Sequence, residues 1–454
     1  MIRLVLSVLT VLSGDPATSP KSEPNRPNVV LILADDLGAT DLGCYGARDL
    51  VTPHLDDLAA RGVRLTQFYA ASSVCSPSRA GLLTGRYPVR CGVSANCSHH
   101  RGGPGWLPPE EQTLGEMFRA AGYDTAHIGK WHLGFTPETI PNRQGFEFSF
   151  GHMSGCIDNY SHSFFLRGGV IHDLYRNDVE VFQNGEYFPT VMVREASRFI
   201  EQPRDRPFFL YFALNAPHYP YQPEAKWIER FRNLQFPRNL YAAFLAGADE
   251  HIGQLLQKLD ELDLRRRTIV VFQSDNGHSE EEFAHFGGGS AGRYRGAKVS
   301  LFEGGIRMPA IISWPGRLPE GVTRDQLLHA CDWVPTLASL CNVPPPKMTL
   351  DGVDMRSILE HDLAPTATRT LHWEVDWKGT TQWAVREGDW KLISNAFYPS
   401  RQDETSIPIP MFLCNLKQDV SERVNLAGPQ SAVLERLRQR HEEFSEGVRL
   451  QTGR

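Results

Sequence analysis

The sequence lacks long runs of like charge and, after its first residues, any apolar stretch near the roughly 18 residues that a membrane-spanning helix needs. Its 454 residues hold 47 Lys and Arg against 53 Asp and Glu, which gives a formal net charge of -6. We therefore expect no nucleic-acid partner and no membrane span in the mature chain. Hydrophobic residues at 41% and charged residues at 22% also exclude a disordered or collagen-like chain.

Cysteine is scarce, and its spacing follows no metal-binding pattern. The eight cysteines form no CxxC pair and have no histidines at zinc-site spacing, which argues against a zinc centre. The sequence leaves open whether Cys91 and Cys97 form a local disulfide. If one cysteine were chemically consumed, an odd number would remain, and at least one thiol would be free.

The N-terminus predicts export. Arg3 precedes a short apolar run from Leu4 to Leu12, and small and polar residues follow up to Pro27. This pattern is typical of a secretory signal, so we interpret residues 1–27 as a signal peptide and linker, and the protein as periplasmic or secreted. The alternative is a disordered tail on a cytoplasmic protein.

From Asn28 onward, strand-like and helix-like segments alternate. This alternation predicts an α/β domain over residues 28–355, in which a large, mostly parallel sheet lies between helices. Residues 356–454 predict a small antiparallel sheet domain with a terminal helix. The expected strands cover residues 28–34, 63–69, 124–128, 208–213, 268–273 and 310–313, and then 370–374, 382–386, 390–394 and 411–416; the expected helices cover residues 53–62, 114–121, 191–200, 241–259 and 431–444.

In parallel sheets, ligands bind beyond the carboxyl ends of the strands. The residues that directly follow the expected strands are therefore the first candidates for a site. They include two pairs of oxygen donors that suit Ca²⁺ or Mg²⁺ better than zinc. The alternative is that each pair only caps a helix or forms a turn. The pairs are Asp35 with Asp36, and Asp275 with Asn276.

Basic side chains also fall in the expected loops and strand ends. Together they could hold a tetrahedral oxyanion beside a divalent metal ion, in a locally cationic pocket of an acidic chain. The alternative for each is a solvated surface charge. The candidates are Arg79, Lys130, His132, His218 and Lys298.

Residues 74–86 read VCSPSRAGLLTGR. This segment predicts that Cys75 lies at a helix N-terminus with Arg79 one turn further on, where both would favour an anion or an activated nucleophile. The alternative is a buried cysteine that precedes a helix capped by Ser76, with Pro77 in its first turn.

The pattern Cys75-x-Pro77-x-Arg79, followed by LLTG, resembles the signature of the sulfatase family. Residues 390–393 and 416–426 also resemble the C-terminal sheet domain of that family. The resemblance implies the fold shared with alkaline phosphatase and the activity of a sulfuric ester hydrolase. The other motifs of the family stand in the same order in this chain: ADDLG (34–38), GKWHLG (129–134), APH (216–218), SDNG (274–277) and RGAKVSLFEGGIRMP (295–309).

The resemblance implies a modified nucleophile and a metal ion. A separate formylglycine-generating enzyme would convert Cys75 to formylglycine, and a hydroxyl of its hydrate would attack the sulfur of an organic sulfate ester. An aldehyde hydrate can expel sulfate by re-forming its carbonyl, which a serine or a thiol cannot do. One divalent cation, usually calcium in this family, would be held by Asp35, Asp36, Asp275 and Asn276.

The resemblance also assigns the basic residues. His132 would take a proton from the remaining hydroxyl so that sulfate is released, and Arg79 would position the formylglycine. Lys130 and Lys298 would clamp sulfate oxygens. His218 with Lys298 would protonate or stabilise the leaving oxygen.

Two segments bear on the substrate, which is expected to be an aryl or carbohydrate sulfate. Residues 151–162 resemble a substrate-side loop of arylsulfatases that act on N-acetylgalactosamine sulfate. Residues 277–282 are unusually acidic for the edge of a sulfate site, and we interpret them as contacts for a substrate hydroxyl or amine. The alternatives are a formylglycine-dependent phosphonate or phosphodiester hydrolase, and an inactive calcium-dependent binding protein.

Overall fold

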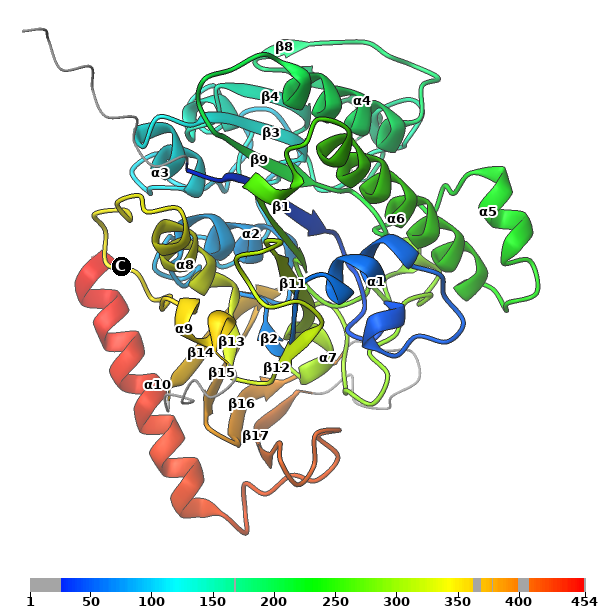
Figure 1. The fold of residues 1–454 in the computed structure, drawn as a ribbon. Helices are drawn as coiled ribbons and strands as arrows, with labels where there is room; N and C mark the ends of the chain where they lie inside the picture. The colour runs from blue at the N-terminus through cyan, green and yellow to red at the C-terminus, as the bar shows by residue number, and fades with distance from the viewer. Residues whose placement is uncertain (1–25, 167–168, 362–368, 378, 399–407, 453–454) are drawn as a thin grey trace, which may run out of the picture.

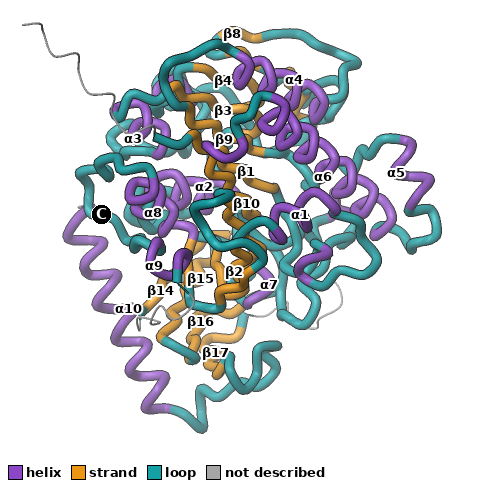
Figure 2. Tube along the Cα trace, viewed as in Figure 1, coloured by secondary structure: helices purple, strands orange, loops and turns teal. Residues whose placement is uncertain are grey.

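One large sheet runs through the middle of the molecule (Figure 1, Figure 2). The computed structural model describes residues 26–166, 169–361, 369–377, 379–398 and 408–452. Within them the main sheet has 11 strands. Their order is β12 (Val322–Arg324), β2 (Val63–Tyr69), β11 (Arg307–Ser313), β10 (Thr268–Ser274), β1 (Asn28–Ala34), β9 (Phe208–Ala213), β3 (Asp124–Lys130), β4 (Phe148–His152), β7 (Tyr175–Arg176) and β8 (Val179–Glu180), with β13 (Leu328–His329) paired to β2.

β1 is buried along its whole length. Val29 and Leu31 belong to one hydrophobic core and Val30 and Ile32 to another, because successive side chains of a strand point to opposite faces of the sheet. A strand that is covered on both faces needs a continuous apolar run, and this is the pattern of the sequence here.

The central strands confirm the predicted parallel arrangement. β1 pairs in parallel with β10 and β9, β9 with β3, and β3 with β4. β11 differs, because it runs antiparallel to both β10 and β2. It is as fully buried as its parallel neighbours, so its apolar pattern could not reveal its direction.

Helices cover both faces of the main sheet, as the alternation predicted (Figure 1). Side chains of α1, α4 and α6 belong to the core that holds Val30, and those of α2, α3 and α8 belong to the core that holds Val29. The helices of this part are α1 (Pro53–Ala60), α2 (Cys75–Thr84), α3 (Leu114–Ala120), α4 (Phe188–Glu201), α5 (Ala225–Arg230), α6 (Arg238–Glu261), α7 (Glu303–Ile306), α8 (Trp333–Leu340) and α9 (Arg356–Glu360), with short 3-10 helices at Gly43–Tyr45, Pro141–Arg143, Arg265–Arg267, Glu282–Ala284 and Ala330–Asp332.

A second sheet near the C-terminus is antiparallel throughout, as expected. One face packs on Tyr69, Val74 and Phe302 of the main part. The other face packs on the long helix α10, which Figure 1 shows in red along the outside of this sheet. The division of the chain at residue 355 stays a prediction. The elements are β14 (Thr370–Trp377), β15 (Thr380–Glu387), β16 (Trp390–Ala396), β17 (Ile409–Asn415) and α10 (Ser431–Thr452); a separate hairpin joins β5 (Ser163–Phe164) and β6 (Ile171–His172).

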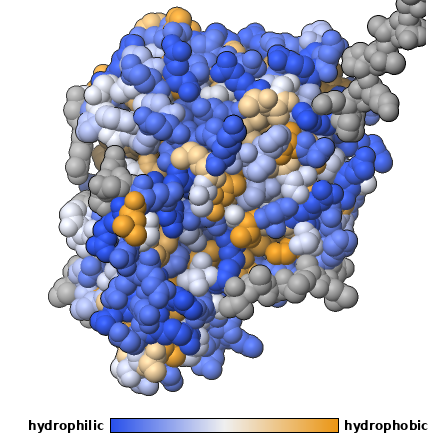
Figure 3. Space-filling view, turned by 90° about the vertical axis from the view of Figure 1, so that its left-hand side faces the viewer, coloured by the Kyte–Doolittle hydropathy of each residue, from blue (hydrophilic) through white to orange (hydrophobic). Residues whose placement is uncertain are grey.

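Residues 1–25 of the predicted signal peptide and linker lie outside the described residues. Within them, no helix has the length and apolar character to cross a membrane. All eight cysteines lie in the described residues and are free. Cys91 and Cys97 therefore do not form the disulfide that the sequence left open. The face shown in Figure 3 is largely hydrophilic, and its apolar side chains lie in small separate groups.

Candidate active site

The ends of β1 and β10 bring the predicted oxygen donors together. The two strands are in register, with Ala34 opposite Ser274, so the residues that follow them meet at the same edge of the sheet. The backbone N–H of Asp36 donates to Oδ1 of Asp275 at 3.1 Å, and Nδ2 of Asn276 donates to Oδ1 of Asp36 at 2.6 Å. All four predicted donors, Asp35 included, are buried.

Cys75 is the first residue of α2, as predicted, but Ser76 is not its cap. The N-cap residue is Val74. The hydroxyl of Ser76 instead donates to the carbonyl of His132 at 2.7 Å and accepts from the N–H of Cys97 at 3.0 Å. The Cys75 thiol lies 3.7 Å from Oδ1 of Asp35. Burial raises the pKa of this thiol, so the unmodified side chain is protonated and a weak nucleophile.

Arg79 lies inside α2, one turn after Cys75 as the segment 74–86 predicted, and it is fully buried; it is not in one of the loops or strand ends expected for the basic candidates as a group. Its Nε and Nη2 donate to Oδ2 of Asp275 at 3.1 and 2.8 Å, and its Nη1 donates to the carbonyl of Lys130 at 3.0 Å. Arg79 therefore ties α2 to the ends of both β10 and β3. One turn of helix separates it from Cys75, so these contacts also fix the N-terminus of α2.

Two lysines neutralise the carboxylates after β1. Lys130, the last residue of β3, donates to both carboxylate oxygens of Asp35 at 2.9 and 2.7 Å. Lys298 donates to Oδ2 of Asp36 at 3.0 Å. Burial opposes the ionisation of Asp35, but the Lys130 ammonium lowers its pKa well below the usual range. Burial raises the pKa of Asp36 to about 7 and that of Asp275 to about 6.

Two of the predicted metal ligands, Asp35 and Asp36, belong to a buried group of side chains that could hold a metal ion. Four ligand atoms lie within 4.8 Å of one another: a carboxylate oxygen each of Asp35 and Asp36, the sulfur of Cys75 and a ring nitrogen of His218. Oδ1 of Asn276 is buried and accepts no hydrogen bond from the part of the chain that the structure describes. Four carboxylates, of Asp35, Asp36, Asp275 and Glu281, face three cationic side chains, of Arg79, Lys130 and Lys298. The side chains alone therefore do not make the cationic pocket that the sequence predicted. A divalent ion would reverse the sign of this charge balance.

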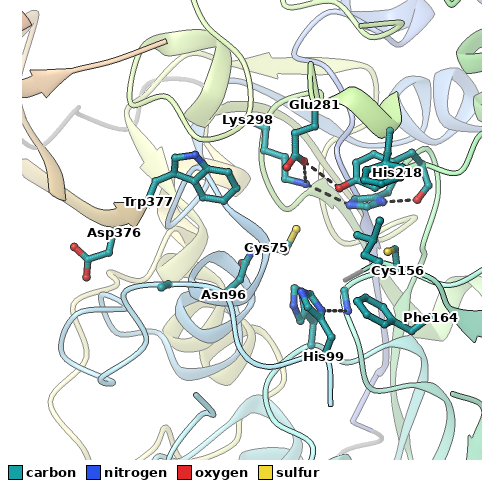
Figure 4. Close-up of a pocket in the computed structure, with 16 residues that line it drawn as sticks. Cys75, Asn96, His99, Cys156, Phe164, His218, Glu281, Lys298, Asp376 and Trp377 are labelled. Atoms are coloured by element: carbon teal, nitrogen blue, oxygen red, sulfur yellow. Dashed lines mark hydrogen bonds and ion pairs between the residues drawn. The ribbon is translucent and has the colours of Figure 1, made fainter. Parts of the chain in front are cut away.

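A cavity of about 400 Å³ opens above these groups. Cys75, His132, His218 and Lys298 line it, and Figure 4 shows the Cys75 sulfur pointing into it. The other predicted site residues do not line it. They lie buried around the four lining residues and are Asp35, Asp36, Arg79, Lys130, Asp275 and Asn276.

The two predicted histidines differ in their hydrogen bonds. Among the described residues, neither ring nitrogen of His132 has a partner, and burial together with the Lys130 charge lowers its pKa well below the usual value. His218 Nδ1 lies 2.6 Å from the carbonyl of Tyr219, and its Nε2 lies 3.3 Å from Lys298 Nζ. A carbonyl only accepts, so Nδ1 carries the proton and Nε2 accepts from Lys298. Burial lowers the pKa of His218 to about 3.

Comparison with known proteins agrees with this geometry. The family model described as Sulfatase matches residues 27–343, which is more than half of the chain. The chain belongs to the sulfatase family. It is an enzyme of the sulfuric ester hydrolase class, as the resemblance implied. A second model, described as the C-terminal part of N-sulphoglucosamine sulphohydrolase, matches residues 294–446.

This sulfatase is similar to curated enzymes along most of its length. It is 35% identical to human arylsulfatase A over 450 residues, which cover 91% of this chain and 86% of that protein. It is 32% identical to human N-acetylgalactosamine-6-sulfatase over 441 residues, covering 89% and 82%. The crystal structure of Ps i-CgsB in complex with k-i-k-neocarrahexaose superposes with a TM-score of 0.83 at 30% identity, covering 92% of this chain and 93% of that one.

Several residues that line the cavity of this sulfatase were missing from the sequence-based set. His99 stacks on His132, and Glu281 lies 3.0 Å from Lys298 Nζ. Asp376 and Trp377 reach the cavity from the end of β14. The acidic run at 277–282 was a signal for Glu281, although it did not single out that residue. No periodicity or motif marked the other three.

Proposed function

We propose that this sulfatase hydrolyses a carbohydrate or aryl sulfate monoester to an alcohol and inorganic sulfate, with a formylglycine made from Cys75 and one bound Ca²⁺. The observation that carries the proposal is the position of Cys75. Its sulfur lies in a cavity beside His132, His218 and Lys298, with buried carboxylates directly beneath it. The names of the relatives, arylsulfatase A and N-acetylgalactosamine-6-sulfatase, support this choice of substrates.

Formylglycine and the metal ion would each supply one kind of chemistry. The hydrated aldehyde offers a hydroxyl nucleophile at residue 75, and the cation offsets negative charge on the sulfate oxygens. Asp35, Asp36, Asp275 and Asn276 would hold the cation. Ca²⁺ is proposed because all four donors are oxygens, and Mg²⁺ is the second choice.

The cationic side chains hold the sulfate group in this proposal. Lys298 lines the cavity and binds a sulfate oxygen directly. Lys130 is directed at Asp35 in the structure; with Asp35 held by the cation, its ammonium would be available to a sulfate oxygen. Arg79 keeps Asp275 and the N-terminus of α2 in place, and so positions residue 75.

Two proton positions follow from the hydrogen bonds. His132 is neutral and both its ring nitrogens are without a partner among the described residues, so it accepts a proton from a hydroxyl of residue 75. Nε2 of His218 carries no proton in its neutral form, so the proton for the leaving oxygen comes from Lys298 Nζ. His218 orients that ammonium by accepting from it.

Maturation requires a formylglycine-generating enzyme as a partner. Cys75 is 1% exposed in the folded chain, so we infer that the segment around it is modified before α2 packs. The N-terminal signal pattern supports a periplasmic or secreted location, in which the folded enzyme meets extracellular sulfate esters.

The test is sulfate release by protein that was matured with a formylglycine-generating enzyme and supplied with Ca²⁺. Mass spectrometry of the peptide that contains residue 75 verifies the modification. A panel of aryl sulfates, sulfated monosaccharides and glycosaminoglycan fragments is then compared with an aryl phosphonate. We expect sulfate release from at least one class, and loss of turnover by at least 10³-fold in Cys75→Ser and Asp275→Ala.

Cys44→Ala is the matched control, because Cys44 is a partly buried cysteine outside the cavity. Its kcat should equal that of the unsubstituted enzyme. Faster turnover of the phosphonate than of every sulfate would replace this function by a phosphonate hydrolase. Full activity of Cys75→Ser would contradict the role of residue 75.

A further inference from the structure

Glu281 is an anion beside a cavity that is proposed to bind another anion. It lines the cavity from the segment after β10, and its side chain is 29% exposed. Burial raises its pKa, but the Lys298 ammonium lowers it by more, to about 2. The carboxylate is therefore ionised and can only accept hydrogen bonds. Its charge repels a sulfate group, so it weakens binding unless it contacts another part of the substrate.

Among the described residues, the side-chain hydrogen bonds and the ion pair of Glu281 fall on one of its two oxygens. Oε2 lies 3.0 Å from Lys298 Nζ, and it accepts from the Tyr219 hydroxyl at 3.3 Å and from the Ser279 hydroxyl at 3.2 Å. Nothing in the described part of the chain donates to Oε1. The three contacts fix the carboxylate group and leave Oε1 open to a ligand in the cavity.

The position of Glu281 is on the side of the leaving group. Lys298 connects it to His218, and this pair is assigned to the leaving oxygen in the proposed function. Figure 4 shows Glu281, Lys298 and His218 grouped on one side of Cys75, and His99 and Phe164 on the other. A carboxylate in contact with the ammonium that protonates the leaving oxygen is within reach of the carbon skeleton that bears this oxygen.

The geometry points to Glu281 as a specificity-determining residue: its Oε1 accepts a hydrogen bond from a hydroxyl on the carbon next to the sulfated carbon. This inference rests on the proposed function and narrows its substrates to vicinal hydroxy sulfates, such as monosulfated sugars. The same negative charge disfavours substrates with a second sulfate or a carboxylate on that neighbouring carbon.

Phenyl sulfate and catechol monosulfate test the inference, because they differ only in a hydroxyl next to the sulfated carbon. The matured enzyme should show a kcat/KM for catechol monosulfate at least on the order of tenfold above that for phenyl sulfate, as expected of a hydrogen bond to a charged acceptor. In Glu281→Ala this ratio should fall to about 1. Glu281→Gln keeps an acceptor oxygen without the charge and should retain part of the preference.

Glu282→Gln is the matched control, because Glu282 is the exposed neighbour of Glu281 and does not line the cavity. It should keep the wild-type ratio. If Glu281→Ala lowers kcat/KM equally for both substrates, Glu281 serves only to hold Lys298 and the inference is wrong. A wild-type ratio near 1 also overturns it but leaves the proposed function standing, since both esters are cleaved. Release of sulfate from neither ester would overturn this inference, whereas the proposed function fails only if no member of the sulfate panel, sulfated sugars included, releases sulfate.

Discussion

His132 lies in a narrow slot at the end of a row of three stacked rings. Its ring stacks on His99 with the centroids 5.2 Å apart, and His99 stacks in turn on Phe164 at 4.7 Å. Gly155 closes the slot, because its N–H donates to Nδ1 of His99 at 3.1 Å. A Cβ at position 155 would lie 2.8 Å from Cε1 of both imidazole rings. The absence of a side chain at residue 155 is thus what allows both rings to keep their positions.

Gly155→Ala should therefore displace His132 and lower kcat. A misplacement of a catalytic group by about 1 Å can cost on the order of 100-fold in rate, so we expect a loss of 10- to 100-fold on an aryl sulfate. The control is Gly447→Ala in α10, where an added Cβ would meet nothing within 4 Å. Steady-state kinetics, with the Tm of each variant measured on the same sample, check the prediction. Unchanged kcat in a folded Gly155→Ala enzyme would show that the slot is wider than the structure indicates.

Single residues differ in how far the sequence could place them. Asp35 and Asp275 follow strands with clear apolar runs, so the rule for strand ends was enough to bring them together. The alternative interpretation made Ser76 a helix cap because serine commonly has that role. A local rule cannot register the carbonyl of His132, 56 residues away, that accepts the hydrogen bond from the Ser76 hydroxyl. Glu281 owes its position in part to Tyr219 and Lys298, which lie 62 and 17 residues away in the sequence.

Helices and strands with a strong hydrophobic pattern were predicted from the sequence, and strands with a weak pattern were not. The sequence-based bounds of β1, β2 and β9 agree with the structure. The short strands β5 to β8 have two residues each, too few to show a period. β14 continues to Trp377, three residues past its predicted end, and this extension brings Asp376 and Trp377 to the cavity. The C-terminal sheet was predicted from the sequence, but the sequence did not predict that residues of this sheet line the cavity.

The contact between β14 and α10 should depend on pH. The ring of His372 on β14 stacks on Phe444 of α10 at 4.1 Å, near Arg90 and His441. Burial, with the charge of His441, lowers the pKa of His372 to about 3. The unfolded chain takes up this proton near pH 6.5. The contribution of neutral His372 to the free energy of unfolding is therefore fully present above about pH 6.5. It falls as the pH drops towards 3, by up to about 1.4 kcal/mol per pH unit.

His372→Phe should make the stability less sensitive to acid, because the ring contact remains and the titration is removed. Nδ1 of His372 is without a partner among the described residues, so no hydrogen bond to that atom is lost. Urea midpoints measured from pH 4.5 to 7.5 give the slope, and His361→Gln, at an exposed histidine, serves as the control. A slope equal to that of the wild type would refute the assignment to His372.

At the scale of the whole molecule, the buried acids under the cavity make cation binding a stability effect. Asp36 and Asp275 have raised pKa values through burial, and a bound Ca²⁺ would compensate their charges only in the folded state. At a Ca²⁺ concentration about 100 times Kd, the gain is about 2.7 kcal/mol, or about 3 °C in Tm for a chain of this size.

Thermal unfolding of chelator-treated protein, with and without added Ca²⁺, measures this shift independently of activity. Asp36→Asn should lose the response to Ca²⁺. Asp263→Asn, which changes an exposed acid that is not one of the candidate ligands, should keep it. A Tm of the chelated wild type that neither Ca²⁺ nor Mg²⁺ raises would contradict the proposed metal site.

The two sheets are also joined by a buried ionic network. Lys391 on β16 contacts Glu303 of α7 at 2.9 Å and Glu422 at 3.0 Å, and all three side chains are fully buried. Glu303 also accepts from the Tyr69 hydroxyl at 2.5 Å. Because Glu303 leads directly into β11, this network fixes the C-terminal sheet, and with it Trp377, relative to the main sheet.

Lys391→Met should strongly destabilise the whole molecule. The substitution leaves the buried Glu422 without its cation and Glu303 with Arg307 at 3.3 Å, for which a loss of about 3–5 kcal/mol is expected. Lys417→Met, at an exposed lysine that follows β17, should cost less than about 0.5 kcal/mol. Urea unfolding of both variants gives the free energies. The loss in Lys391→Met should be smaller at pH 6 than at pH 8, because burial already raises the pKa of Glu422 to about 7 and protonation removes the unpaired charge. A loss below 1 kcal/mol, or one that is equal at both pH values, would show that this network does not hold the sheets together.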